Sequence, residues 1–194
     1  YEFKSDIPLP AKTKGAKKAT SRTEAFTSKS FGGLSCYHTH PPLKVGKGTV
    51  LGGRCADTLN VVADVYVALD AYSAPPTPPP WHQDGKVRFS FPITDMQAPK
   101  DPAEFKLLIN YLAEALEEGK TVHVGCIGGH GRTGTVLAAL VAQVLKEEDP
   151  ITYVRTHYCT KAVETSSQIE FLVKHYKAKS VEGSKKYGTG YTSA

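Results

Sequence analysis

The chain has few cysteines and no long apolar run, and both shortages limit what it can be. Its 194 residues include four cysteines at irregular spacings, with no C-x-x-C pair. That spacing argues against a zinc cluster and against a dense disulfide framework. No stretch approaches the roughly 20 apolar residues of a membrane helix, and no secretory pattern opens the sequence. We therefore expect one soluble, cytoplasmic domain with reduced thiols and no membrane partner.

The sequence also has little net charge outside its N-terminal segment. The formal net charge is +5, and the first thirty residues hold seven Lys or Arg against three Asp or Glu. This segment is too poor in aliphatic residues to offset the entropy of ordering. We predict a flexible basic extension over 1–33, a folded domain over 34–180 and a flexible tail over 181–194. The extension fits a solvated arm better than a nucleic-acid arm, and the near-neutral domain argues against a polynucleotide groove.

The folded part alternates strand-like and helix-like segments. Apolar and β-branched runs predict strands over 48–53, 61–69, 87–91 and 121–126. Capping residues and apolar periodicity predict helices that start after Asp101, span 135–145, start after Asp149 and span 165–177. The proline-rich stretch 74–80 is predicted to be a stiff extended loop. This order predicts an α/β fold of three layers, a central mainly parallel sheet flanked by helices.

The turn after the 121–126 strand carries the clearest chemical signal. It reads Cys126-Ile127-Gly128-Gly129-His130-Gly131-Arg132-Thr133-Gly134. Glycines let backbone N–H groups point at an oxyanion, and the N-terminus of the following helix adds its positive end. The turn is therefore predicted to bind phosphate. It is not the nucleotide-binding G-x-x-x-x-G-K-[ST] loop, because Arg132 stands where that loop has Lys.

A cysteine at the first position of such a loop predicts a nucleophile. The inward N–H groups, the helix dipole and the Arg132 guanidinium all stabilise a thiolate over a thiol at Cys126. The planar guanidinium of Arg132 can hold two phosphoryl oxygens and keeps its charge throughout a reaction. Both residues therefore fit phosphoryl transfer through a covalent intermediate.

The loop resembles the signature C-x-x-x-x-x-R-[ST] of the cysteine-based protein tyrosine phosphatase superfamily. Its G-G-x-G-R-T-G form is most similar to the dual-specificity-like members, including the kinase-associated and cell-division-cycle phosphatases. The resemblance covers residues 46–177 and implies a protein tyrosine phosphatase-like fold. It implies that Cys126 is the nucleophile and that Thr133 stabilises the leaving thiolate. The phosphate-binding residues that it implies are Ile127, Gly128, Gly129, His130, Gly131 and Arg132.

The resemblance also implies a general acid on a mobile loop upstream of the nucleophile. Such an acid is needed because an alkoxide or phenolate leaves poorly without a proton. Residues 91–99 resemble that loop, so Asp95 is the candidate acid and later the base for the attacking water. The alternative is that Asp95 is a solvated loop carboxylate. Weaker candidates are Asp70, Asp84 and Asp101, the last of which is already explained as a helix cap.

A glutamine that orients the hydrolytic water is implied at Gln168, since residues 161–168 resemble the relevant segment. Thr165-x-x-Gln168 is also a capping box, so Gln168 fits a helix start equally well. Two positions depart from the pattern. The family usually has His directly before the nucleophile, whereas this chain has Gly125, which leaves His123 and His130 as candidates to tune the thiolate. Thr94 stands where Pro often precedes the acid.

The function implied is a phosphomonoester hydrolase with a phosphocysteine intermediate, acting on phosphorylated protein without a metal or other cofactor. No segment matches a deep phosphotyrosine-clamping loop, so we expect a shallow pocket open to phosphotyrosine and to phosphoserine or phosphothreonine. Similar folds carry different functions, which leaves RNA 5′-triphosphatase, phosphoinositide phosphatase and a non-catalytic phosphate-binding module as alternatives. Loop residues that either rim the pocket or pack beneath it are Tyr37, His38, His40, Tyr72, Trp81 and His82.

Overall fold

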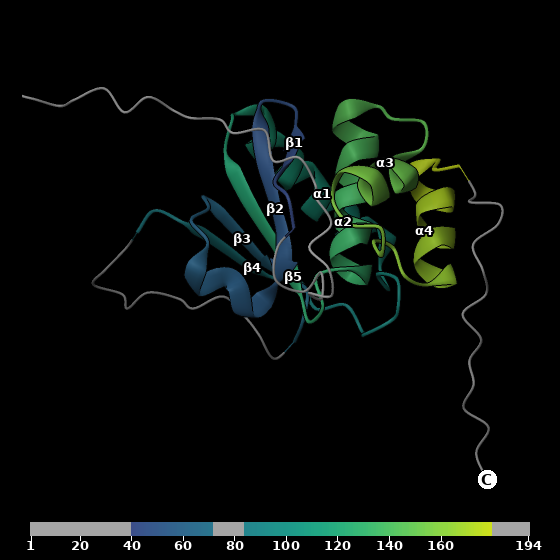
Figure 1. Ribbon diagram of the computed structural model, residues 1–194, viewed down its shortest axis with the longest axis horizontal. Coiled ribbons are helices and arrows are strands. Elements are labelled where there is room, and N and C mark those ends of the chain that lie inside the picture. The colour runs from purple at the N-terminus through teal and green to yellow at the C-terminus, as the bar shows by residue number, and fades with distance from the viewer. Residues whose placement is uncertain (1–39, 72–83, 180–194) are drawn as a thin grey trace, which may run out of the picture. The chain divides into compact units, whose positions relative to one another are not determined.

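The computed structural model describes residues 40–71 and 84–179 (Figure 1). The predicted flexible segments 1–33 and 181–194 and the proline-rich loop 74–80 lie outside the described residues, so the domain boundaries stay a prediction. In the described part, no helix combines the length and the apolar content of a membrane span. Within the same part, Cys55, Cys126 and Cys159 are not joined by disulfides.

Five strands form one mixed sheet in the order β1-β2-β5-β3-β4 (Figure 1). They are β1 Leu43–Val45, β2 Gly48–Arg54, β3 Val65–Ala68, β4 Val87–Ser90 and β5 Thr121–Cys126. β1 and β2 are antiparallel, whereas β2–β5, β5–β3 and β3–β4 are parallel. The central strand β5 is buried from Val122 to Cys126, as parallel strands covered on both faces are. The predicted mainly parallel sheet is confirmed.

Two parts of the first half of the domain differ from the prediction. The strand predicted over 61–69 begins only at Val65. In the segment before it, the Ala63 N–H donates to Tyr66 Oη at 3.0 Å and Tyr66 Oη donates to the Val61 carbonyl at 2.9 Å, so these backbone groups bond to a side chain. Apolar composition alone did not reveal these contacts. Strand β1 and the short 3-10 helix η1, Cys55–Asn60, were not predicted.

The α-helices of the described part are α1 Pro102–Glu117, α2 Gly131–Leu140, α3 Pro150–His157 and α4 Ser166–Tyr176. Three of these four, α1, α3 and α4, begin where the capping residues predicted. Asp101 accepts hydrogen bonds from the first N–H groups of α1, and Asp149 does the same for α3. Thr165 and Gln168 form the predicted capping box of α4. The helix predicted over 135–145 starts earlier, at Gly131, and continues as a wider π-helical turn, η2 Val141–Leu145.

The helices and the sheet form layers that place the loop between β5 and α2 at the carboxyl edge of the parallel strands. Helices α1 and α2 pack against β2 and β5, and α3 and α4 pack against α2 (Figure 1). The short helix η1 lies on the other side of the sheet from α2 (Figure 1). The three layers agree with the predicted fold class. As a result, the carboxyl end of β5 and the N-terminus of α2 meet at residues 126–131, which we call the Cys126 loop.

Candidate functional site

The Cys126 loop lies at the carboxyl edge of the parallel strands, where open α/β sheets bind their ligands. Gly129 has a φ of +76°, a conformation that L side chains rarely adopt. A Cβ at Gly129 would lie 2.9 Å from the backbone carbonyl carbon of Gly53 on β2. Glycine is therefore needed there both for the turn and for the close approach of the loop to β2.

The Cys126 side chain lies inside its own loop. Its residue is only 3% exposed, and the Gly129 N–H donates to Cys126 Sγ at 3.2 Å. A backbone N–H group of the loop is therefore directed at the sulfur atom. The next side chain, Ile127, is exposed to solvent.

Arg132 connects the Cys126 loop to the predicted acid loop, residues 91–99. Its Nη1 donates to the carbonyls of Ile93 at 2.9 Å and Leu69 at 3.3 Å, and the buried carboxylate of Asp70 lies 3.7 Å away. Its Nη2 lies 2.8 Å from Asp95 Oδ1, and the Asp95 side chain is 66% exposed. Buried partners thus fix the guanidinium, while Asp95 approaches it from the solvent side.

The other three carboxylates considered as acids have different surroundings. Asp101 caps α1, and Asp70 is buried beside Arg132. Hydrogen bonds from Arg88 hold the pKa of Asp84 well below its usual range, which makes Asp84 a poor proton donor. Among the four candidate acids, Asp95 alone combines an exposed side chain with a contact to Arg132.

Thr133 and Gln168 both lie near the Cys126 loop but have other partners in this structure. The fully buried Thr133 hydroxyl donates to the Gly53 carbonyl at 3.3 Å. The Gln168 carbonyl oxygen accepts from the N–H groups of Glu164 and Thr165, so the capping interpretation is confirmed. Its amide Nε2 donates to the Gln97 carbonyl of the acid loop at 3.4 Å. Gln168 therefore links the start of α4 to that loop.

The glycine that precedes Cys126 has a steric explanation. A Cβ at Gly125 would lie 2.8 Å from the Cys55 backbone nitrogen and 2.9 Å from the Arg54 carbonyl carbon. Real Cβ atoms do not approach backbone this closely, so a side chain at this position requires the start of η1 to move. Gly125 therefore stands where the family usually has His because β5 lies too close to the junction of β2 and η1 to leave room for a side chain.

The two candidate histidines occupy different places. Successive strand residues point to opposite faces, so His123 lies on the face of β5 away from the Cys126 side chain. Burial lowers the pKa of His123 to about 4, which keeps it neutral. His130 is the N-cap residue of α2, and burial lowers its pKa as well. His130 Nδ1 lies 3.9 Å from Glu164 Oε1.

Two residues that support the loop were missed in the sequence. Tyr158, which ends α3, donates its hydroxyl proton to the Gly129 carbonyl at 2.6 Å. A Cβ at Gly52 would lie 2.6 Å from the Tyr158 ring. The glycine pair Gly52-Gly53 in β2 was therefore the feature of the sequence that could have indicated a large side chain packed against this strand. Glu164 accepts a hydrogen bond from the Gly131 N–H at the start of α2, and burial raises the pKa of its carboxyl.

Comparisons with known proteins show which family the chain resembles. Residues 54–186 match a family model described as "Swiss Army Knife protein, DSP-PTPase phosphatase domain". Two uncharacterized proteins of Methanocaldococcus jannaschii are 44% and 43% identical over 86 and 88 residues. These matches cover 44% and 45% of this chain and 57% and 54% of the relatives. The chain therefore spans about half the length of these curated relatives.

Solved structures with the same fold include phosphatases. The crystal structure of Tk-PTP in the active form matches with a TM-score of 0.55 and 27% identity, covering 70% of this chain and 95% of that one. The structure of PTPMT1 in complex with PI(5)P matches with a TM-score of 0.58 and 19% identity, covering 70% of this chain and 94% of that one. The second match shows likeness of fold alone. The predicted protein tyrosine phosphatase-like fold is thus confirmed.

Proposed function

Because the chain belongs to the DSP-PTPase phosphatase family, we propose that it hydrolyses phosphomonoesters through a phosphocysteine at Cys126. One observation carries the assignment of roles. The guanidinium of Arg132, held by buried partners, joins the loop that contains the Cys126 thiol to Asp95 at 2.8 Å. In this proposal Cys126 is the nucleophile, Arg132 binds the phosphate and Asp95, from a separate loop, is the acid, which are the three groups that phosphoryl transfer to a cysteine uses.

In the first proposed step, Cys126 Sγ attacks phosphorus. The S–P bond forms as the bond from phosphorus to the leaving oxygen breaks, and Asp95 gives its proton to that oxygen. Arg132 and the N–H groups of residues 127–131 hold the non-bridging oxygens. In the ligand-free structure Asp95 lies against Arg132 Nη2. Phosphoryl oxygens would replace the carboxylate there and leave Asp95 beside the leaving oxygen.

In the second proposed step, water attacks the phosphocysteine. The O–P bond forms, the S–P bond breaks, and Asp95 takes the proton from water. Thr133 would donate a hydrogen bond from its hydroxyl to the returning thiolate, which requires the hydroxyl to leave the Gly53 carbonyl. Gln168 would orient the water through its amide Nε2, because its carbonyl oxygen is engaged by the cap of α4.

The proposed substrate is a phosphorylated protein side chain. Ile127 and Met96 are 58% and 52% exposed and directly follow Cys126 and Asp95. Two apolar side chains beside the nucleophile and the acid favour a carbon-rich leaving group such as the ring of phosphotyrosine. The thiolate must stay reduced to act, so we also propose a reducing compartment such as the cytoplasm.

The test is release of inorganic phosphate from an aryl phosphate, with reductant present and no added metal. Cys126→Ser should abolish turnover, and Asp95→Asn should lower it by about 10²–10⁴-fold through loss of the acid. Asp101→Asn is the matched control, because Asn still caps α1 and the residue lies outside the site. Turnover that survives in Cys126→Ser would rule out the phosphocysteine.

A panel of phosphopeptides, 5′-triphosphorylated RNA and phosphoinositides then identifies the substrate class. The proposal predicts the highest kcat/KM for phosphotyrosyl peptides. A higher value for RNA or for a phosphoinositide would replace the protein substrate with that class, while leaving the Cys126 chemistry in place.

A further inference from the structure

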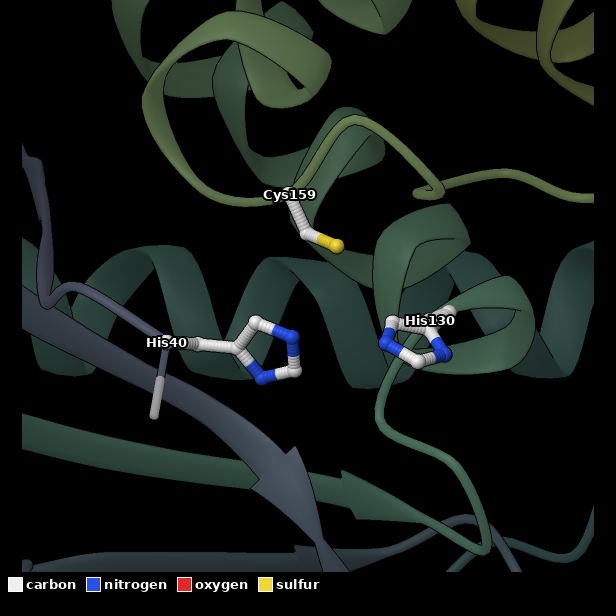
Figure 2. A group of neighbouring side chains, drawn as sticks. All are labelled: His40, His130 and Cys159. Carbon is white, nitrogen blue, oxygen red and sulfur yellow. The ribbon is translucent and has the colours of Figure 1, made fainter. Parts of the chain in front are cut away.

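Three side chains from distant parts of the sequence converge behind the Cys126 loop. They are His40, just before β1, His130, the N-cap of α2, and Cys159, just after α3 (Figure 2). One potential ligand atom of each lies within 4.8 Å of the other two. His130 and Cys159 are buried, and His40 is half-buried. Figure 2 shows the two imidazole rings next to each other, with the Cys159 thiol directed toward the space between them.

The hydrogen bonds of His40 determine which of its nitrogens carries a proton. The Tyr158 hydroxyl donates its one proton to the Gly129 carbonyl at 2.6 Å. Tyr158 Oη can therefore only accept at its 3.1 Å contact with His40 Nδ1, so Nδ1 carries the proton. Nε2 of the neutral ring then carries a lone pair. Among the described residues, that buried nitrogen has no hydrogen-bond partner.

The two histidines of the cluster lie close together. The two rings lie edge to face, with centroids 5.2 Å apart and an interplanar angle of 88°. The cluster therefore contains a lone pair on the His40 imidazole, a second imidazole and a thiol, which is a donor set for a borderline-soft metal ion.

We propose that His40, His130 and Cys159 bind one Zn²⁺ ion that acts structurally and takes no part in the phosphoryl transfer. A tetrahedral Zn²⁺ with bonds of 2.0–2.3 Å places its donor atoms about 3.3–3.6 Å apart. Donor atoms that now lie within 4.8 Å of one another need to approach by at most about 1.2–1.5 Å. On binding, the Cys159 thiol releases its proton to solvent, and water fills the fourth position.

The structure gives His40 an orienting partner and places a carboxylate close to His130, without a hydrogen bond between the two. Zinc-bound histidines donate their second N–H to a carboxylate, a carbonyl or another acceptor. His40 has Tyr158 Oη in this position at 3.1 Å. His130 has the Glu164 carboxylate 3.9 Å from its Nδ1.

Metal binding at this cluster would stabilise the Cys126 loop. His130 belongs to that loop, and Tyr158, which orients His40, holds the Gly129 carbonyl. The ion would therefore tie the loop to the segment before β1 and to the segment after α3. The spacing of the cysteines argued against a zinc cluster, but spacing cannot reveal a site assembled from three separate segments.

The experiment measures metal binding in the full chain with Cys126→Ser, which removes the thiolate that would compete for the ion. Co²⁺ is titrated while its thiolate charge-transfer absorption is followed, and Zn²⁺ affinity is measured by competition. One equivalent should bind. Adding Cys159→Ser should abolish the thiolate band, and adding His40→Gln should weaken Zn²⁺ binding by more than about 100-fold, since even outer-sphere changes cost 10–100-fold.

Two further variants separate a specific site from general metal binding. Cys55→Ser removes a buried thiol outside the cluster and should leave the Co²⁺ spectrum and the affinity unchanged. Tyr158→Phe keeps all three ligands but removes the acceptor of His40 and should weaken Zn²⁺ binding by about 10–100-fold. Zn²⁺ should raise the melting temperature of the Cys126→Ser protein.

Several outcomes would overturn the site. They are the absence of Co²⁺ binding, a thiolate band that persists without Cys159, or a Zn²⁺ affinity that is indifferent to His40→Gln. If Cys159→Ser does not fold, His40→Gln decides, because His40 is only half-buried. None of these readouts requires turnover, so a failure here is distinct from a failure of the proposed phosphatase activity.

Discussion

Replacing His123 by leucine tests how this central histidine is used. The residue is 2% exposed on β5, and burial lowers its pKa to about 4, against 6.5 in an unfolded chain. Nearby Asp57 opposes the shift but does not cancel it. Among the described residues, His123 Nε2 has no hydrogen-bond partner, so no bond offsets the cost of charging the ring.

The direction and size of the effect follow from proton linkage. Between pH 6.5 and 4 the unfolded chain binds a proton at His123 that the folded protein does not. Stability is therefore intact above pH 6.5 and is lost as the pH falls toward 4. At pH 5 the unfolded state is favoured about 30-fold by this proton, which corresponds to about 2 kcal/mol.

The assay is urea unfolding of the wild type and His123→Leu at pH 7.5 and pH 5. The wild type should lose about 2 kcal/mol more than the variant between the two pH values, because all other titrating groups are common to both. His157→Gln, an exposed histidine, serves as the control and should behave as the wild type.

Kinetics of the same variant decide whether His123 tunes the nucleophile. Its side chain lies on the opposite face of β5 from Cys126, so the pH profile of kcat/KM should not change in His123→Leu. Equal pH sensitivity of stability in both proteins would refute the claim that the fold keeps His123 neutral. A shifted kcat/KM profile would place His123 in the catalytic machinery.

Three other predictions follow from contacts of the site. Gly125→Ala should lower stability by about 1–3 kcal/mol in thermal or urea melts, because the Cβ would press on the Arg54–Cys55 backbone. Glu164→Gln should lower the inhibition constant of inorganic phosphate several-fold, because a carboxylate leaves the N-terminus of α2; exposed Glu170→Gln should not change it. Asp101→Ala should cost about 0.5–2 kcal/mol in urea melts through loss of the α1 cap, with kcat unchanged.

The elements predicted best are those whose signals are local. Asp101, Asp149 and Thr165 each cap a helix through bonds to residues two or three positions away, so the sequence window contains the whole interaction. The errors came from segments whose state depends on distant partners. Residues 61–64 have the composition of a strand, yet they lie outside β3, and backbone groups of Val61 and Ala63 bond to the Tyr66 hydroxyl.

The sequence by itself determined the chemical identity of the candidate site. A cysteine, three glycines and an arginine within seven positions predict a phosphate loop, because the loop backbone and the following helix form from contiguous residues. The same local logic placed Asp95 on a loop between a strand and a helix.

Only the tertiary structure decided which groups meet. The ion pair of Arg132 with Asp95, the closeness of Gly125 to Cys55, and the convergence of His40 and Cys159 on His130 all join residues far apart in the chain. Such contacts depend on the strand order β1-β2-β5-β3-β4 and on the packing of α3 against α2, which no residue spacing encodes.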